Sequence, residues 1–411
     1  MSCRQVLESY FRAAVAAASP AVCLPPALPS GRPAGRTVVL GCGKAAAEMA
    51  AVAASVLEGE VTGCVVTRHG QGVGIDTGPI AVVEAGHPVP DAASLAAGER
   101  LHSVAAGVRA GDRVVFLISG GGSALLCLPL PGLSLATKAA ITTHLVRSGV
   151  AIDQINLVRR HLSRVKGGRL AAAAAASSDM HSFLISDVVG DDPAAIASGP
   201  TVPCRFEPEA ALTVLAASGW AVTPDLAAAV RQAEAVNAPP HPVRIVARGA
   251  DALERITTLA TADGWNVVRL GDELAGDAAA TGRAHAALAM AHAHQGGRHL
   301  LLSGGELTVT VTAQGGRGGP NLEYLAGLMQ ALPPGAPVAA LAGDSDGIDG
   351  TEDNAGGWFD AATRADAETC AKALAGNRSH DLFAALGGLV HTGPTGTNVN
   401  DIRMIAVETI E

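Results

Sequence analysis

The stretch VVLGCGKAAAEMA, residues 38–50, decides how the first part of the chain folds. Its apolar start predicts a buried strand, its glycines predict a tight turn, and its alanine-rich end predicts a helix. The pattern Gly41-x-Gly43-x-x-Ala46 is close to the dinucleotide-binding fingerprint. Lys44, however, stands inside the turn, where a helix N-terminus already favours anions. The stretch therefore allows two interpretations, a nicotinamide site or a site where the lysine holds a phosphate or a carboxylate.

Short apolar runs of the same kind alternate with helical stretches along most of the chain. They are rich in β-branched residues or leucine, and each ends in glycine or another turn residue. The runs span residues 37–43, 63–70, 81–86, 113–122, 181–190, 243–249, 265–271, 299–306 and 337–347. Because helices between strands connect parallel neighbours, the alternation predicts a parallel α/β fold. Residues 306–313 alternate between polar and apolar side chains, which predicts an antiparallel or edge strand.

The length of the chain and one proline-rich segment predict two domains. At 411 residues the chain is too long for one ordinary core. The polar, proline-rich segment 236–244 is followed by a new strand, so we expect one α/β domain over residues 1–236 and another over 244–411. Apolar residues between Val6 and Ala14 share one helical face. This favours an amphipathic first helix over a cleaved signal peptide.

The composition excludes several classes of protein. Hydrophobic residues make up 48% and charged residues 16% of the chain, so it should fold completely around apolar cores. The net charge of -9 gives no basic footprint for nucleic acid. The 7 cysteines are scattered, which argues against disulfides and a cysteine zinc site and favours a reducing, cytoplasmic location. No apolar run approaches the ~18 residues of a membrane span, and the apolar composition leaves room for a homodimer.

A glycine loop follows one of the predicted strands, and open parallel sheets bind ligands at the carboxyl ends of their strands. This loop is Ser119-Gly120-Gly121-Gly122-Ser123. Three successive glycines let backbone amides converge on an anion, and the two serines can donate further hydrogen bonds. We expect the loop to bind a phosphate or a carboxylate. No Walker A sequence occurs in the chain.

The second half of the chain repeats this device. A strand ends in a similar serine and glycine stretch, and a flexible glycine loop with Arg317 follows it, before a predicted helix. An arginine in such a loop suits a nucleotide polyphosphate, because its guanidinium binds phosphate oxygens in pairs. The residues expected to bind the nucleotide are Ser303, Gly304, Gly305, Glu306, Asn321 and Glu323.

Two acidic strand ends supply carboxylates. Asp344, Asp346 and Asp349 lie in a glycine-rich loop behind a strand, and hard oxygen ligands in such a loop suit Mg²⁺ that is shared with phosphates. Asp187 and Asp192 follow another strand, and either one could orient a hydroxyl or a metal-bound water. Some of these aspartates also fit the roles of turn formers and helix caps.

Other segments add polar groups. Arg159 opens the basic segment 159–166 and is a candidate for binding the substrate, although cations at a helix end also favour stability by themselves. Ser198, in the segment after the second acidic strand end, is a further candidate for binding the substrate or its phosphate. His285 and His292 share a helix face without a carboxylate partner, and we expect a solvated face rather than a metal site. The segment 392–401 is expected to form a wall for a small polar substrate through Thr395, Thr397, Asn398 and Asn400.

Taken in order, these motifs resemble the glycerate 2-kinase family, also called the MOFRL family. The resemblance covers nearly the whole chain, and many long motifs match in order, although Leu322 departs from many members and Pro320 from some. Members also carry an older hydroxypyruvate reductase label. The matching stretches are GCGKAAAEMA, EAGHPVPDAAS, LISGGGSALL, VRRHLSRVKGGRLA, ISDVVGDDPAAIASGPT, LSGGELTVTV, GRGGPNLE, GDSDGIDGTEDNAGG and TGPTGTNVNDI.

The resemblance implies two α/β domains, a Rossmann-like parallel one and a second with a mixed sheet, and an active site in the cleft between them. It implies phosphorylation of D-glycerate at its 2-hydroxyl by ATP with Mg²⁺, giving 2-phosphoglycerate. Lys44 and Arg317 fall where the family places catalytic or substrate-holding cations. Lys44 would then hold the glycerate carboxylate or the transferring phosphoryl group, and Asp187 or Asp192 would take the hydroxyl proton.

Two other functions stay open. A NAD(P)H-dependent hydroxypyruvate reductase is supported by the fingerprint at residues 41–46. The next strand, however, ends at Arg68 and His69 rather than in the acid that usually binds the ribose, although an arginine could suit a 2′-phosphate. A non-catalytic sugar-acid binder would not need three carboxylates and two glycine loops. Mg²⁺-dependent nucleotide binding would separate the kinase from both.

Overall fold

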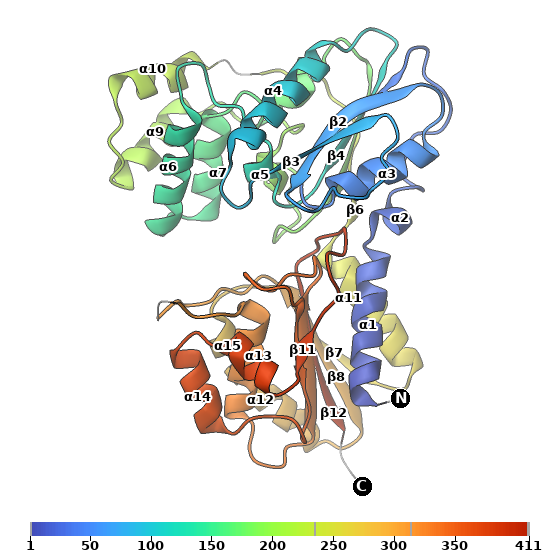
Figure 1. Ribbon diagram of the computed structural model, residues 1–411, viewed down its shortest axis with the longest axis vertical. Helices are drawn as coiled ribbons and strands as arrows, with labels where there is room; N and C mark the ends of the chain where they lie inside the picture. Colours follow the sequence, from blue (N-terminus) through green and yellow to red (C-terminus); the bar gives the residue numbers. More distant parts are fainter. Residues whose placement is uncertain (1, 234–235, 313–314, 409–411) are drawn as a thin grey trace. The chain divides into compact units, whose positions relative to one another are not determined.

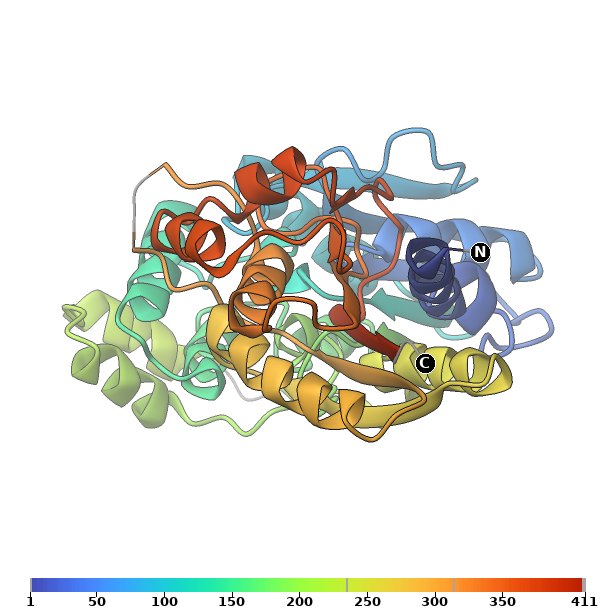
Figure 2. The same ribbon diagram turned by 90° about the horizontal axis from the view of Figure 1, so that it is seen from below.

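The computed structural model describes residues 2–233, 236–312 and 315–408, and the chain divides into two units (Figure 1). The N-terminal unit comprises residues 20–246, and the C-terminal unit comprises residues 1–19 and 247–411. The division falls near residue 246 rather than at residues 236–244, because the strand that follows the proline-rich segment joins the sheet of the N-terminal unit. The first helix, α1 (Cys3–Ala17), packs instead on α11 (Gly249–Ala262) of the C-terminal unit, because its apolar stripe is buried there (Figure 1, Figure 2).

The N-terminal unit is built on one six-stranded sheet. Its strands are β1 (Thr37–Cys42), β2 (Val61–Arg68), β3 (Ile80–Ala85), β4 (Arg113–Ile118), β5 (Asp179–Ile185) and β6 (Val243–Ala247). They lie in the order β3-β2-β1-β4-β5-β6, and β1 to β5 pair in parallel. This confirms the parallel α/β prediction and gives the strand order of a Rossmann sheet. Such sheets bind ligands where the order reverses, here between β1 and β4.

Helices of the N-terminal unit form two groups. α3 and α4 pack on the sheet, while α6, α7, α9 and α10 surround a second apolar core of their own (Figure 1). The helices are α2 (Pro20–Cys23), α3 (Ala46–Val56), α4 (Ala92–Ala106), α5 (Gly122–Leu125), α6 (Leu135–Arg147), α7 (Ile152–His161), α8 (Arg169–Ala173), the 3-10 turn η1 (Ile196–Ser198), α9 (Pro208–Ala217) and α10 (Pro224–Gln232).

The C-terminal unit contains a mixed six-stranded sheet, as expected. Its strands are β7 (Asn266–Leu274), β8 (Arg298–Gly305), β9 (Val338–Asp344), β10 (Gly356–Phe359), β11 (Leu389–Val390) and β12 (Asp401–Glu408). The order is β11-β10-β9-β12-β8-β7. Only β7 and β8 pair in parallel among these strands, and the remaining neighbours are antiparallel. An antiparallel neighbour on each side of β12 explains why this half departs from a purely parallel fold.

Helices cover both faces of this second sheet. α1 and α11 lie on one face, and the others lie on the opposite face (Figure 1). Those others are α12 (Ala278–Ala293), α13 (Pro320–Ala331), α14 (Ala367–Ala375) and α15 (Ser379–Ala385). α12 and α13 pack closely because Gly282 and Gly327 bring a backbone against the facing helix, where a Cβ would collide with a carbonyl. Within the part of the chain that the structure describes, no helix has the length and apolar character needed to cross a membrane.

The strand predicted over residues 306–313 is wrong for its described part, residues 306–312; Ala313 lies outside the described residues. The segment makes only one bridge, from Thr308 to Asp277, among the described residues. Its alternation has no neighbouring strand to pair with, and Val311 is 76% exposed. The segment therefore forms one wall of a cavity instead of an edge of the sheet.

Candidate active site

The turn between β1 and α3 is closed by the chain's own glycine loop. The amide of Lys44 donates to the Gly120 carbonyl at 2.8 Å, and the amide of Ala45 donates to Ser119 Oγ at 3.0 Å. Gly43 permits this approach, since it has a φ of 130° and a Cβ there would collide with Ser119. In a dinucleotide site the same room and the same amides bind the pyrophosphate. The amides of Lys44 and Ala45, just before α3, are therefore already engaged within the protein, contrary to the expectation that this turn offers them to an anion.

Lys44, His87 and Asp187 come together around the glycine loop. A Cβ at Gly121, where φ is 76°, would lie 3.2 Å from ring atoms of His87 and from Lys44 Cγ, and one at Gly120 would collide with the Asp187 carboxylate. The glycines thus allow the side chains of Lys44, His87 and Asp187 to approach the loop backbone closely. The helix that follows them, α5, spans only 4 residues. The Asp187 carboxylate would repel an anion bound in the loop. It is, however, well placed to accept a proton beside the Lys44 side chain. His87 was not predicted, although it lies in the quoted stretch EAGHPVPDAAS.

Three of the predicted site residues, Ser123, Ser198 and Arg159, belong to one chain of hydrogen bonds. The hydroxyls of Ser123 and Ser198 are 2.7 Å apart, and Ser198 Oγ donates to Asn156 Oδ1 at 3.4 Å. The Arg159 guanidinium donates to the same oxygen at 3.5 Å. Ser198 is fully buried and, like Ala197, has a left-handed backbone, with φ of 62° and 52°. Such a conformation is costly for residues other than glycine, and it often marks functional sites.

Two buried lysines adjoin this chain. Lys166 is 0% exposed and donates to the Ala197 carbonyl at 3.2 Å, while burial and the nearby Lys138 lower the pKa of Lys166 to about 7. Burial also lowers the pKa of Lys138, whose ammonium has no oxygen acceptor among the described residues and lies near the Cys127 thiol. Burial lowers the pKa of Arg159 as well. Lys166 ends the basic segment noted in the sequence, whereas Lys138 gave no signal there, because nothing local predicts its burial.

The two aspartates behind β5 take different roles. Asp187 lies against Gly120 as described above. Asp192 Oδ1 accepts from the Ala194 amide at 2.9 Å, and its carbonyl accepts from the amides of Ala195 and Ile196. Asp192 therefore stabilises the turn that leads into η1, one of the two roles that the sequence allowed.

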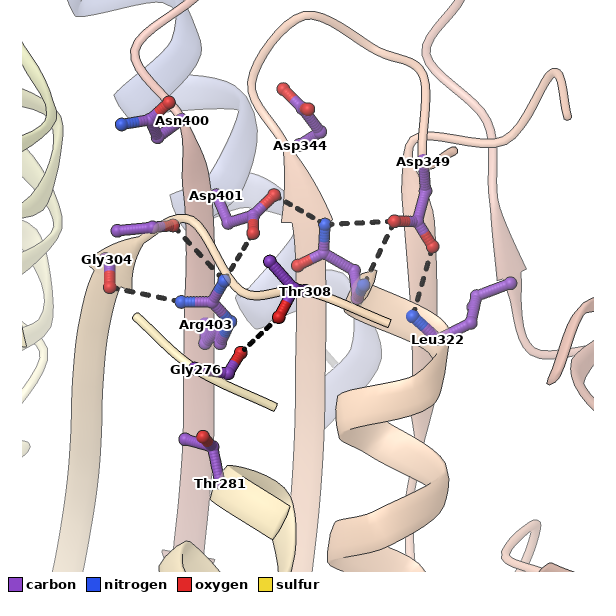
Figure 3. Close-up of polar contacts among 12 residues, drawn as sticks. Gly276, Thr281, Gly304, Thr308, Leu322, Asp344, Asp349, Asn400, Asp401 and Arg403 are labelled. Carbon is purple, nitrogen blue, oxygen red and sulfur yellow. Dashed lines mark hydrogen bonds and ion pairs between the residues drawn. The ribbon is translucent and has the colours of Figure 1, made fainter. Parts of the chain in front are cut away.

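The second serine and glycine stretch ends strand β8 and does not open a helix. The carbonyls of Gly304 and Gly305 accept hydrogen bonds from the Arg403 guanidinium at 3.1 and 3.2 Å (Figure 3). Arg403 is buried and pairs with Asp401. Ser303 is buried within β8, and Glu306 follows as an exposed residue. Gly304 and Gly305 thus bind the buried Arg403 side chain through their carbonyls, whereas the sequence predicted that they bind an anion.

Asp349 and Asn321 anchor the start of α13. Asp349 Oδ1 accepts from the Asn321 amide at 3.0 Å and from its side chain at 3.2 Å, and Oδ2 accepts from the Leu322 amide at 3.1 Å (Figure 3). The Asn321 side chain also donates to Asp401 at 2.7 Å. Asp349 is 1% exposed, and burial raises its pKa to about 7. Both residues therefore stabilise the helix N-terminus.

The three carboxylates predicted to bind a metal do not assemble as a set. Over residues 2–233, 236–312 and 315–408, no three His, Cys, Asp or Glu side chains are arranged to hold a metal ion. Asp344 accepts from the Asp346 amide and Asp346 from the Ile348 amide, each at 2.8 Å, as in turns. With Asp349 engaged at α13, Asp344 and Asp346 are the remaining candidates.

A cavity of about 730 Å³ lies in the C-terminal unit. Its walls are the extended segment after β8, the glycine loop before α13, and Glu323 on α13. Glu323 is 6% exposed, and burial raises its pKa to about 7. Leu307, Val309 and Val311 supply an apolar wall. A cavity of this size, with one apolar wall and a few polar groups, has the character of a small-molecule site.

Arg317 does not line this cavity. Its side chain is 52% exposed and forms ion pairs with Glu352 at 2.5 Å and Asp381 at 3.7 Å. The carboxylate of Glu352 raises the pKa of Arg317 further. Exposed pairs of this kind contribute at most about 1 kcal/mol, so the guanidinium can change partners at little cost.

The segment 392–401 largely binds to its own unit. The hydroxyls of Thr395 and Thr397 each donate to a backbone carbonyl, at 2.5 and 2.7 Å. Asn398 Oδ1 accepts from the Asn400 amide at 3.3 Å. Asn400 has a left-handed backbone, with φ of 66°. The two threonine hydroxyls thus shape the loop rather than present donors to a ligand.

His285 is not on a solvated face, so that expectation is wrong. It is 7% exposed, its Nδ1 lies 2.9 Å from the Tyr324 hydroxyl, and burial lowers its pKa to about 4. The packing of α12 on α13 places it there.

Comparisons with known proteins match the whole chain. A family model described as a domain of unknown function, DUF4147, matches residues 6–233, and one described as the MOFRL family matches residues 299–401. A protein of Agrobacterium vitis that bears a hydroxypyruvate reductase name is 42% identical over 99% of this chain and 95% of its own. A glycerate 2-kinase of Pyrococcus horikoshii is 36% identical over 91% of this chain and 88% of its own. The crystal structure of a glycerate kinase from Thermotoga maritima, 32% identical, superposes with a TM-score of 0.88 and covers 99% of both chains.

Proposed function

The chain belongs to the glycerate 2-kinase family, the MOFRL family, and we propose that it transfers a phosphoryl group from ATP to the 2-hydroxyl of D-glycerate, giving 2-phosphoglycerate. One observation carries the proposal beyond family membership. Ser119 and Gly120 fill the room at the β1–α3 turn that a dinucleotide would need, while Lys44 and Asp187 lie at the same glycine loop. A cation beside a carboxylate suits phosphoryl transfer to a hydroxyl.

We assign the acceptor side to the N-terminal unit. Lys44 supplies positive charge to the transferring phosphoryl group, and Asp187 accepts the proton of the 2-hydroxyl. Phosphoryl transfer depends on positioning and charge neutralisation more than on covalent chemistry. The close approach of both side chains to Gly120 and Gly121 supports this assignment. Asp192 is less suited as the base, because its carboxylate holds the turn into η1.

We assign the donor side to the C-terminal unit. The cavity of about 730 Å³ has the volume of a small-molecule site, and its apolar wall at Leu307 and Val311 suits a nucleotide base. The glycine loop 315–319 brings backbone amides to the same cavity, and these suit the phosphates. Arg317 would exchange its exposed partner Glu352 for a phosphate oxygen.

Asp344 and Asp346 fit Mg²⁺ as a partial set of ligands. Mg²⁺ commonly takes one or two carboxylates and completes its shell with waters and substrate phosphates. When bound there, the ion would neutralise charge on the phosphates. The turns at residues 344–348 orient the two carboxylates, because each accepts a hydrogen bond from a backbone amide.

A hydroxypyruvate reductase is the alternative that the Agrobacterium vitis relative's name and the Rossmann strand order favour. The experiment that separates the two incubates the protein with D-glycerate, ATP and Mg²⁺ and identifies the product by NMR. Lys44→Met should lower kcat by about 100-fold or more. Lys372→Met, at an exposed lysine on α14, is the matched control and should keep full activity.

Each contrary outcome corrects a different part of the proposal. Formation of 3-phosphoglycerate would keep the kinase and refute the position of transfer. Oxidation of NAD(P)H by hydroxypyruvate without any phosphorylated product would refute the kinase. Full activity of Lys44→Met would remove Lys44 from the mechanism.

A further inference from the structure

Two buried lysines and a half-buried arginine lie near one another in the N-terminal unit, and none of them forms an ion pair with a carboxylate among the described residues. Lys138 lies on α6, Arg159 lies on α7, and Lys166 lies just before α8. The groups that shift the pKa of the two lysines most, apart from burial, are the three cations themselves and the thiols of Cys42 and Cys127. Buried charges in proteins are normally paired, because an unpaired one loses its hydration without compensation. An anion that is not part of the chain would complete this group.

The group offers hydrogen-bond donors that the protein does not use. An ammonium carries three donors. Lys138 is 4% exposed and has no oxygen acceptor within the described part of the chain, with only the Cys127 thiol close to its ammonium. Lys166 donates to the Ala197 carbonyl at 3.2 Å. Ser198 lies next to Ala197 and has a left-handed backbone conformation. Its carbonyl accepts a hydrogen bond from the Gly167 amide, which ties this segment to the residue after Lys166. Strain and unused donors together indicate a preformed anion site.

The group lies at the same end of β1 as the glycine loop. A Cβ at Gly122 would lie 2.8 Å from Cys42 Sγ and 2.6 Å from Ala197 Cβ, so the loop rests on two neighbours of Lys166. Ser123, the next residue of the loop, bonds to Ser198 at 2.7 Å. An anion at the cations is therefore next to the loop against which Lys44 and Asp187 lie.

We propose that Lys138, Arg159 and Lys166 bind the carboxylate of the 2-hydroxy acid whose adjacent hydroxyl is phosphorylated. This inference rests on the proposed function and names the group that recognises its substrate. It leaves Lys44 for the transferring phosphoryl group. In a 2-hydroxy acid the carboxylate and the hydroxyl sit on neighbouring carbons, so binding the first at the cations directs the second to the loop.

Enclosure favours a small carboxylate over a nucleotide phosphate. Lys138, Lys166 and Ser198 are each at most 4% exposed, and only Ser123 and Arg159 are partly open. Groups that are so enclosed admit a small carboxylate more readily than the bulk of a nucleoside. The substrate class is therefore small 2-hydroxy acids, and a polyol without the carboxylate is rejected because the cations stay unpaired.

Binding of the anion should be linked to a proton. Burial and Lys138 hold the pKa of Lys166 at about 7 in the free protein, and a bound carboxylate raises it again. At pH 8 each glycerate that binds should therefore bring on the order of one proton with it. The other groups that face Lys166 are Arg159 and the thiols of Cys42 and Cys127, and burial raises the pKa of Cys42 to about 12, so that thiol stays neutral.

The test titrates D-glycerate into the full chain without nucleotide, by calorimetry at pH 8 in two buffers of different ionisation enthalpy. Lys138→Met and Lys166→Met remove a charge at nearly constant volume, and Lys372→Met is the exposed control. We expect tenfold or greater loss of glycerate affinity in the first two, none in the control, and no proton uptake in Lys166→Met. Glycerol should not bind. Binding of inorganic phosphate with no binding of glycerate would overturn the carboxylate assignment.

Thermal unfolding separates a ligand site from a structural role. Because unpaired buried charge is unfavourable, both variants should melt at or above the wild-type temperature without ligand and should lose the rise in Tm that glycerate causes. Variants that are destabilised and still bind glycerate normally would overturn the inference. If wild type makes 2-phosphoglycerate and neither variant changes KM for glycerate, the inference fails and the kinase stands. If wild type makes no product but glycerate binding needs both lysines, the kinase fails and the anion site stands.

Discussion

Replacing Lys166 by methionine should stabilise the N-terminal unit at pH 6 and less so as the pH rises. Burial, together with Lys138, lowers the pKa of Lys166 from the ordinary 10.5 to about 7, and the further groups that face it are Arg159, Cys42 and Cys127. Because the pKa in the folded state lies below that in the unfolded chain, the unfolded chain binds more protons between pH 7 and 10.5. Wild-type stability therefore increases with pH across this window. Methionine cannot titrate, so the variant lacks this dependence.

The size of the effect follows from the two pKa values. Their difference, 10.5 minus about 7, corresponds to roughly 5 kcal/mol of destabilisation of the wild type at pH values well below 7. The variant loses the hydrogen bond to the Ala197 carbonyl, which costs roughly 1–2 kcal/mol. A net stabilisation of about 3 kcal/mol at pH 6 remains, and titration of the wild type removes roughly 3 kcal/mol of it by pH 9.

Urea unfolding at pH 6, 7, 8 and 9 measures this difference. Trp220 is the one tryptophan in the sequence of the N-terminal unit, so its fluorescence reports that unit once Trp265 and Trp358 are replaced by phenylalanine in both proteins. Lys372→Met should show no dependence of the difference on pH. A difference between Lys166→Met and wild type that stays constant from pH 6 to pH 9 would refute the depressed pKa and, with it, the unpaired state of the buried cations.

Three further predictions test the closed turn, the α13 anchor and the cavity. Ser119→Ala should cost about 1–2 kcal/mol in urea unfolding, since the buried Ala45 amide loses its acceptor, and should still not bind NADPH in a fluorescence titration; tight NADPH binding would contradict the account of the turn. Asn321→Ala should cost about 2–3 kcal/mol by calorimetry, because two buried carboxylates lose a donor, and an unchanged stability would contradict that role. Burial raises the pKa of Glu323 to about 7, so the acid is neutral below that pH and charged above it. The KM for nucleotide should therefore rise between pH 6 and pH 8 in wild type and stay constant in Glu323→Gln; parallel profiles would place the nucleotide elsewhere.

Much of the fold could be predicted because its signals are local. Residues 38–50 form the expected strand, turn and helix, since an apolar run, two glycines and an alanine-rich run each act over a few neighbours. The alternation of such runs predicted the parallel sheet, and the motifs in their order predicted the family. Residues 306–312 are the exception, because their alternation suits a strand but no neighbouring strand among the described residues lies beside them to pair with.

The candidate site could be predicted only in part. The glycine loop, Lys44 and Asp187 stand at strand ends, where a parallel sheet brings polar groups together, and the structure does bring them together. Asp349 matched the pattern of a metal ligand equally well in sequence, yet its carboxylate caps α13. Lys138 matched no pattern at all.

The sequence by itself determined the local elements, the two-part organisation and the family, since each depends on side chains that are neighbours along the chain. Only the tertiary structure decided which polar groups are already used. The Ala45 amide, just before α3, is taken by Ser119, which is 74 residues away in sequence. The cations of α6 and α7 are buried beside Lys166 by the packing of helices that are separate in the chain. Burial and hydrogen-bond partners depend on residues that are close in space. They set the protonation state of each group and decide which donors and acceptors remain for a ligand.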